Sequence, residues 1–174
     1  MPVVARPMAP QAPWSLRLGG SWVASLGEGL DGWGLGASLA RGPWAFGLQG
    51  RMLSGGDDEA HTRAVVVLAE ALRRWTVGRW ELGLGVHLGG AWYGRSESME
   101  AQRVPLGGFA DAETDGARAL TVRAGGTGTV ALRVWRSLAL TSRVDAFGRA
   151  AWRRDLDQSA FGVELSAGLQ WEVR

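Results

Sequence analysis

The 174-residue sequence contains no cysteine, no lysine, only two histidines and no long apolar run. The lack of cysteine excludes disulfides and thiolate metal sites. Because no stretch of about 18 apolar residues occurs, a transmembrane helix is excluded as well. A formal net charge of +2 is too small to indicate nucleic-acid binding by itself. Glycine, with 27 residues, and tryptophan, with 10, are unusually abundant instead.

The first 13 residues hold four of the six prolines and are expected to form a semi-rigid linker. The remaining residues, 14–174, suffice for one domain. The chain does not open with the charged and then apolar pattern of a signal peptide. We therefore expect either that a signal peptide has been removed or that residues 1–13 follow an upstream domain.

A two-residue hydrophobic period runs through most of the chain and is the pattern of β-strands. In 79–95, for example, Trp80, Leu82 and Leu84 alternate with glycine and polar residues. Eight such segments are expected: 14–26, 33–40, 43–52, 61–75, 79–95, 120–135, 138–149 and 161–173. The fourth is the weakest, because it is apolar nearly throughout and its spacing also allows a helix. If Glu70 lies on its polar face, Val65 and Val67 lie on its apolar face.

The connections between these segments alternate in length. Short turns are expected near 40–43, 73–79 and 134–137. Longer loops are expected at 27–32, 53–61, 95–118 and 152–159. Short turns at one end and long loops at the other are typical of an up-and-down meander, which can close on itself and leave no free edge. The predicted fold is therefore all-β: an eight-stranded antiparallel up-and-down barrel.

The composition of the two strand faces indicates which one points outward. A water-exposed face built on glycine, serine and alanine would gain little packing. The interior of a small barrel is narrow, however, and needs small residues among a few large polar ones. The apolar face should therefore point outward, into lipid. The alternative is a soluble lipocalin-like barrel, with the apolar face inside and an apolar ligand bound there.

The tryptophans support the membrane interpretation, because all ten fall toward a strand end and most share the apolar parity. Indole buries its ring in lipid and keeps its N–H near water, so outer-membrane barrels carry two aromatic girdles. Core tryptophans of a β-sandwich, the other explanation, would have no reason to avoid strand middles. The expected girdle residues are Trp14, Trp22, Trp33, Trp44, Trp80, Trp92, Trp152 and Trp171.

Charges also separate along the strands. Twelve of the 17 acidic residues fall in the expected long loops. Five arginines fall in the expected short turns: Arg41, Arg73, Arg74, Arg79 and Arg136. The two ends of the barrel are therefore expected to differ in charge.

Taken together, residues 14–173 resemble the small eight-stranded outer-membrane barrels of Gram-negative bacteria, the OmpA-like and OmpX-like kind. The last strand is the most specific part, since residues 166–173 match the spacing of the β-signal recognised by the barrel-assembly machinery. They depart from it in ending on Val173 and Arg174 in place of a terminal Phe. The resemblance implies an outer-membrane location, contact with the lipid bilayer and lipopolysaccharide, insertion by that machinery, and a monomer with a possible upstream periplasmic domain.

The inward face carries an unusual number of charged residues: Arg17, Arg51, Arg63, Glu70, Glu81, His87, Arg123, Arg133, Arg143, Asp145, Arg149, Glu164 and Glu172. Charges in a narrow lumen are costly unless they are paired. We expect them to form a polar network that plugs the lumen. The alternative is a narrow pore that favours anions, because arginine is in excess.

The sequence does not predict catalysis, a cofactor or a metal site. Ser54, Asp57 and His61 are close in sequence, but loops rich in serine and aspartate are common. Asp57, Asp58 and Glu59 could hold a hard cation, yet they lack the regular spacing of a dedicated site. The expected function is that of a non-catalytic membrane anchor or surface scaffold. Its acidic loops, of which 95–118 is the longest, would be exposed, and no nucleic-acid partner is expected.

Overall fold

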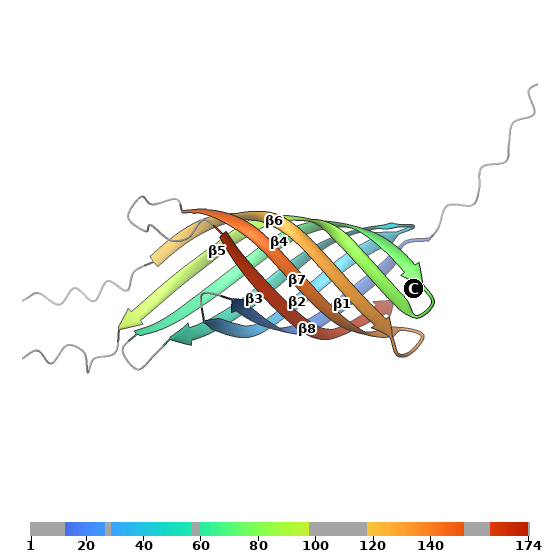
Figure 1. Cartoon of the computed structure of the whole chain (residues 1–174), viewed down its shortest axis with the longest axis horizontal. Coiled ribbons are helices and arrows are strands. Elements are labelled where there is room, and N and C mark those ends of the chain that lie inside the picture. Colours follow the sequence, from blue (N-terminus) through green and yellow to red (C-terminus); the bar gives the residue numbers. More distant parts are fainter. Residues whose placement is uncertain (1–12, 27–28, 57–59, 98–117, 152–160, 174) are drawn as a thin grey trace, which may run out of the picture.

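The computed structural model describes residues 13–26, 29–56, 60–97, 118–151 and 161–173, and every element in them is a β-strand. The strands are β1 (Ser15–Leu26), β2 (Leu30–Arg41), β3 (Trp44–Gly56), β4 (Ala60–Val77), β5 (Trp80–Glu97), β6 (Arg118–Arg133), β7 (Leu138–Ala151) and β8 (Phe161–Val173). Each pairs antiparallel with the next, and β8 returns to β1 (Figure 1). The expected eight-stranded barrel is confirmed. Within the described ranges, no helix is long and apolar enough to cross a membrane.

The register fixes how strongly the strands tilt. The residues paired across successive strands from Ser15 are Ala40, Ala45, Leu72, Gly85, Thr127, Asp145, Glu164 and finally Ser25. One circuit thus returns to β1 ten residues farther along, from 15 to 25. A stagger of this size forces the strands to lie oblique to the barrel axis. Residues far apart in the sequence therefore meet at one level of the lumen.

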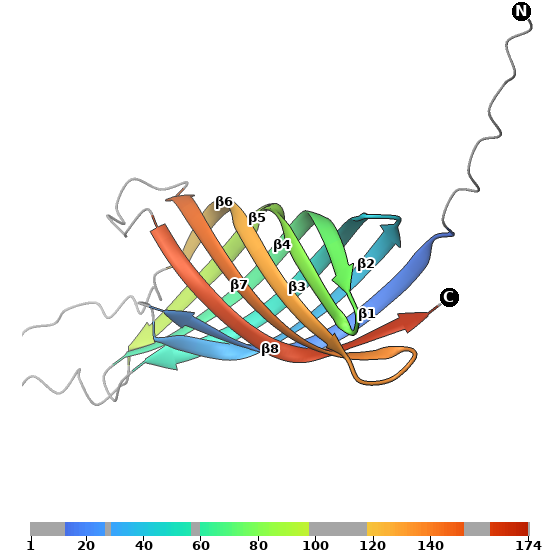
Figure 2. The same ribbon diagram turned by 45° about the vertical axis from the view of Figure 1, so that its right-hand side comes forward.

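The short turns lie at the end of the barrel where β1 begins and β8 finishes (Figure 2). We call this the turn end and the opposite one the loop end. Two of its turns are built on Gly42 and Gly78, with φ of 57° and 61°. Only glycine adopts this left-handed conformation at little cost, so these glycines allow two-residue connections.

Several expected boundaries were wrong, among them both ends of the predicted loop 95–118, because β5 continues to Glu97 and β6 begins at Arg118. β2 already begins at Leu30 and β3 continues to Gly56, so the predicted loops 27–32 and 53–61 are too long. The predicted turn 73–79 is too long as well, because β4 continues to Val77. Glycine, aspartate and paired arginines gave these segments the composition of loops. Their backbones are nevertheless held by pairing with the neighbouring strand, as Asp31 with Ser54 shows.

The weak fourth segment is the strand β4 and not a helix. Val65 and Val67 point outward, as the position of Glu70 predicted, and they are exposed. Val66 and Leu68 point inward and are almost fully buried. Both faces of β4 are therefore apolar over this stretch, which is why its two-residue period was obscured.

The exterior of the barrel is apolar, and the interior is small or polar. Leu35, Leu48 and Leu84 are each 62% exposed on the outside. Glycine on the inner face lets the wall close tightly around the lumen. A Cβ added at Gly85 or Gly125 would collide with a backbone oxygen of the neighbouring strand. Larger residues are excluded at these two positions by the backbone itself.

Candidate functional site in the lumen

The lumen is filled in layers whose order follows from the register of the strands. From the turn end to the loop end they are a first ion-pair network, a cavity, a second and larger network, and an apolar layer. We call the two networks the lower and the central network. Each layer takes side chains from several strands, because the oblique strands bring different sequence segments to one level.

The lower network lies at the turn end and centres on Arg17 of β1. Its guanidinium donates to both carboxylate oxygens of Glu81, at 2.5 and 3.0 Å, and to Glu172 at 3.2 Å. The contact with Glu172 follows from the pairing of β1 with β8, which places Arg17 opposite Glu172. Arg74 also donates to Glu81, at 3.2 Å. Arg133 is 3.8 Å from Glu172 and 42% exposed at the mouth of the barrel.

The central network joins three arginines to three carboxylates in the middle of the lumen. Its members are Arg51, Arg123, Arg143, Glu70, Asp145 and Glu164. Arg51 bridges Asp145, at 2.5 Å, and Glu164. Arg123 reaches the other oxygen of Glu164, at 2.5 Å. Arg143 bonds both oxygens of Asp145 at 2.8 Å and also Glu70, so the chain of contacts is continuous across the barrel.

Neutral polar groups complete this network. The hydroxyl of Thr127 donates to Asp145, and His87 Nδ1 lies 3.0 Å from the same hydroxyl oxygen. Gln49 donates to Glu70 at 3.2 Å and accepts from Arg51 at 2.9 Å. The central network thus ties together strands from most of the circumference and gains from each extra hydrogen bond. Buried charges are tolerated only where such bonds replace the lost water.

The formal charges of the central network are balanced, with three arginines against three carboxylates. Most of these side chains are at least nine-tenths buried. Removing any one member would leave an opposite charge in a dry environment, which is far costlier than losing a surface ion pair. The network therefore favours one arrangement of the lumen over all others.

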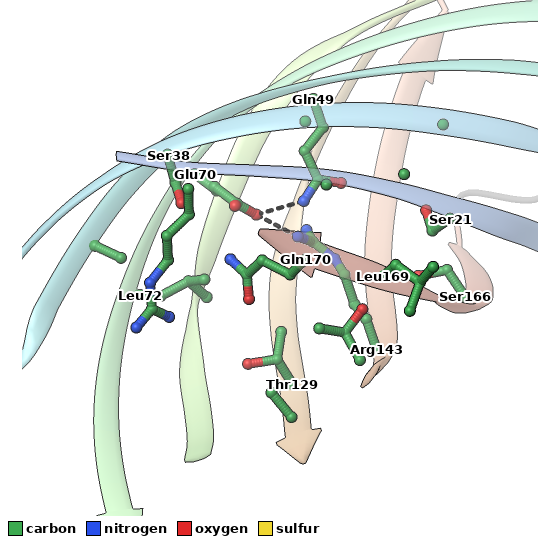
Figure 3. Close-up of a pocket in the computed structure, with 18 of the residues that line it drawn as sticks. Ser21, Ser38, Gln49, Glu70, Leu72, Thr129, Arg143, Ser166, Leu169 and Gln170 are labelled. Carbon is green, nitrogen blue, oxygen red and sulfur yellow. Dashed lines mark hydrogen bonds and ion pairs between the residues drawn. The ribbon is translucent and has the colours of Figure 1, made fainter. Parts of the chain in front are cut away.

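A cavity of about 120 Å³ separates the two networks. Small and polar residues line it together with Leu35, Leu72 and Leu169; the polar ones include Ser21, Ser38, Thr129, Ser166 and Gln170 (Figure 3). Glu70 lies at its border between Gln49 and Arg143 (Figure 3). A cavity of this size, with charged and hydroxyl groups in its wall, has room for a few water molecules. It is bounded on both sides by ion pairs.

The loop end of the lumen is closed by an apolar layer that the sequence analysis did not predict. It comprises Val23, Leu30, Leu53, Ala64, Val66, Leu68 and Ala91, with Tyr93 packed against it. Arg123 joins it to the central network, because its guanidinium lies 3.5 Å from the ring centre of the buried Phe147. Arg149 stands beside Tyr93, with Nη1 3.4 Å from the hydroxyl.

One residue predicted to face inward lies on the outer face. Arg63 was expected inside, but it is exposed on the outer face, on the same parity as Val65. The remaining predicted lumen residues lie on the inner face: Arg17, Arg51, Glu70, Glu81, His87, Arg123, Arg133, Arg143, Asp145, Arg149, Glu164 and Glu172. Arg74 was missed because it was assigned to a turn. Leu30 and Leu53 were missed because their segments were assigned to loops.

Seven of the predicted girdle tryptophans lie exposed on the outside near a strand end: Trp14, Trp22, Trp33, Trp44, Trp80, Trp92 and Trp171. Trp152 lies outside the described residues. Trp75 and Trp135, which were not among the predicted girdle residues, are exposed at the turn end too.

The residues considered for catalysis or metal binding are only partly described. Asp57, Asp58 and Glu59 lie outside the described residues, while Ser54 and His61 are exposed. In the described part of the chain, no group of three or more acidic, histidine or cysteine side chains could hold a metal ion. The chemistry of the lumen is that of mutual neutralisation, with carboxylates and guanidinium groups occupied by one another.

No known protein family and no curated protein matches the chain. Solved structures do match. A major outer membrane protein from Thermus thermophilus has a TM-score of 0.66 at 10% identity, over 92% of this chain and 100% of that one. Neisserial surface protein A matches with a TM-score of 0.57 at 13% sequence identity, over 94% of this chain and 99% of that protein. The N-terminal β-barrel domain of Pseudomonas aeruginosa OprF matches with a TM-score of 0.54 at 8% sequence identity, over 94% of this chain and 99% of that domain. The chain thus has the fold of eight-stranded outer-membrane barrels.

Proposed function

We propose that this protein lies in the bacterial outer membrane as a non-catalytic anchor and surface scaffold with a closed lumen. The observation that carries the proposal is the inverted distribution of side chains. Apolar residues cover the outside, and the charges are paired within. Such a surface is stable in lipid and not in water, because contiguous apolar patches of this extent are rare on soluble proteins.

The soluble lipocalin-like alternative does not fit this distribution. A soluble barrel that binds an apolar ligand needs an apolar cavity and a polar exterior. Here the cavity is bordered by Arg17, Glu70 and Arg143, and the apolar layer at the loop end is filled by its own side chains. The exposed leucines of the exterior would meet water directly.

The narrow anion pore is also less well supported than a closed lumen. A permeating anion would have to cross the apolar layer around Val66 and Leu68 and then break the pairs of the central network. Eight strands leave a lumen just wide enough for side chains to fill. Part of the arginine excess that favoured a pore lies outside the closed part of the lumen. Arg63 is on the outer face, and Arg133 is at the mouth of the barrel.

The scaffold role rests on the loops, since loops on a rigid framework commonly carry function. Residues 98–117, which join β5 to β6, are far more than that connection requires. With the strand ends beside them, residues 95–118 hold five acids and three arginines. We propose that this connection is an outward-facing docking segment for a cationic or divalent-bridged partner, such as metal-linked lipopolysaccharide. Summed negative potential attracts divalent ions without a formal site.

Insertion by the barrel-assembly machinery belongs to the same proposal. Residues 166–173, which have the spacing of a β-signal, lie on β8, the strand that closes the barrel against β1. Such a signal would act before that pairing forms. We further propose that the barrel is a monomer, because its closed sheet leaves no free strand edge among the described residues.

Two measurements test this proposal. The purified protein should need detergent, and its unheated form should migrate differently from its heated form in gel electrophoresis. In planar lipid bilayers the folded protein should show no stable conductance. A monodisperse, detergent-free protein with a full β-sheet spectrum would refute the membrane location, and steady ion conductance would refute the closed lumen.

A further inference from the structure

Four arginines surround the turn end of the barrel. Arg41 and Arg73 lie on the outer face of β2 and β4, and Arg79 and Arg136 lie in turns at the mouth of the lumen. We call this group the arginine collar. Arg73, Arg79 and Arg136 are exposed, and Arg41 is half-buried at the end of β2. Arg79 and Arg136 lie in the β4–β5 and β6–β7 turns. The collar therefore borders much of the barrel circumference at one level.

The described residues around the arginine collar include no exposed acidic side chain. Over the described residues, the acids at the turn end are Glu81 and Glu172, and both point into the lumen. Arg17 holds both of them, so they are neutralised within the lower network. Among the described residues, the exposed charged groups at this end are therefore all guanidinium groups.

Two members of the collar are held against tryptophan rings. The guanidinium of Arg41 lies 5.3 Å from the ring centre of Trp14, and that of Arg73 lies 5.4 Å from Trp75. Arg73 projects from the outer face of β4 and is paired with Trp44 of β3. A long basic side chain at this position can extend along its strand, so that its charged end reaches the membrane interface. The rings and the charges thus share one level.

We propose that the arginine collar binds the phosphate groups of anionic phospholipids in the leaflet at the turn end. This inference rests on the proposed membrane location. The planar guanidinium donates paired hydrogen bonds that match phosphate oxygens. A basic side chain near an anionic lipid surface strengthens association by about fivefold. The tryptophans place these groups at headgroup depth.

The arrangement of the collar favours a lipid leaflet over a soluble phosphate compound. Its members come from β2, β4 and two different turns, so they do not converge on one point. A single small anion could contact only one or two of them. A leaflet offers a separate phosphate to each arginine around the wall.

Tryptophan quenching by brominated lipid tests the inference. The protein is folded into phosphatidylcholine vesicles that contain the same fraction of either brominated phosphatidylglycerol or brominated phosphatidylcholine. We expect stronger quenching by the brominated anionic lipid than by brominated phosphatidylcholine, and we call the quotient of these two effects the quenching ratio. The fourfold variant R41Q/R73Q/R79Q/R136Q should reduce this ratio to about one. Sodium chloride at about 1 M, where the Debye length is about 3 Å, should reduce it too.

Arg63 provides a matched control, because it lies on the outer face of the same strand as Arg73 but at the loop end. The sequence beside it, residues 55–59, is acidic and repels anionic lipid. R73Q should lower the quenching ratio, while R63Q should leave it unchanged. Inorganic phosphate should lower it no more than sodium chloride of equal ionic strength.

The outcomes separate the two proposals. Failure of the wild-type protein to fold into vesicles of either composition would refute the membrane location. If it folds but both brominated lipids quench equally, or if the fourfold variant keeps the full ratio, the collar does not bind anionic lipid. A specific effect of inorganic phosphate would also overturn the inference, because it would identify a site for a soluble anion.

Discussion

Replacing Glu164 by glutamine should destabilise the barrel strongly, because this carboxylate neutralises two buried arginines at once. Arg51 and Arg123 donate to its two oxygens, and all three side chains are about 2% exposed or less. Glutamine preserves the size of the side chain and removes its charge. Arg51 would keep Asp145 as a partner. Arg123 would lose its carboxylate partner and keep the face of Phe147 and at most a neutral amide oxygen.

The expected cost follows from the burial of the uncompensated charge. Breaking a buried ion pair by removing one partner costs about 3–5 kcal/mol. Glu164→Gln should fall in this range, because Arg123 Nε and Nη1 already have no hydrogen-bond partner in the described structure. Arg133→Gln is the matched control. Its guanidinium lies 3.8 Å from Glu172, and the arginine side chain is 42% exposed. Loss of this ion pair should therefore cost at most about 1 kcal/mol.

Reversible urea unfolding in lipid vesicles, followed by tryptophan fluorescence and by gel migration without heating, measures both variants. The free energy of unfolding should fall much more for Glu164→Gln than for Arg133→Gln. The double variant Arg123→Met/Glu164→Met should lose less stability than the sum of the losses in Arg123→Met and Glu164→Met. The reason is that the double variant leaves no buried charge without a partner. Equal small losses in Glu164→Gln and Arg133→Gln would refute the idea that the central network is dry and tightly coupled.

Three further predictions concern the wall and the loops. Leu84→Arg should cost about 2–4 kcal/mol in the same unfolding assay if this exposed position faces the middle of the bilayer; a cost near zero would place it outside the lipid. Gly85→Ala should cost about 1–3 kcal/mol through overpacking, since its Cβ would collide with the backbone oxygen of Ala71, whereas Gly50→Ala, with open space around it, should cost little; equal effects would contradict the packing argument. Deleting residues 98–114 should preserve the difference in gel migration between the unheated and the heated protein and abolish divalent-dependent lipopolysaccharide binding; unchanged binding would make the segment a spacer.

The amino-acid sequence by itself determined which face of each strand is apolar. The period of two residues is a local property, since successive side chains of any strand point to opposite faces. The face carrying Leu82, Leu84 and Val86 could therefore be assigned to the outside without knowledge of the neighbouring strands. The strand count and the meander order followed in the same way, from repeated segments separated by turn residues.

Strand ends were the least predictable local feature. Leu30 and Leu53 stand in segments whose glycine and aspartate content indicates loops, yet backbone pairing extends the strands through them. The consequence was functional, because these two leucines belong to the apolar layer that closes the loop end. Arg63 shows the complementary error, in which a charge assigned to the lumen lies on the outer face.

Only the tertiary structure decided which charges meet. Parity places Arg51 and Glu164 in the lumen, but they are 113 residues apart in the sequence, and parity does not give their height along the barrel axis. Height depends on the register of every strand pair, which accumulates to a stagger of ten residues around the closed barrel. A shift of one strand would give each arginine different neighbours. The pairing of Arg17 with both Glu81 and Glu172, and the cavity above them, exist because all eight registers close together.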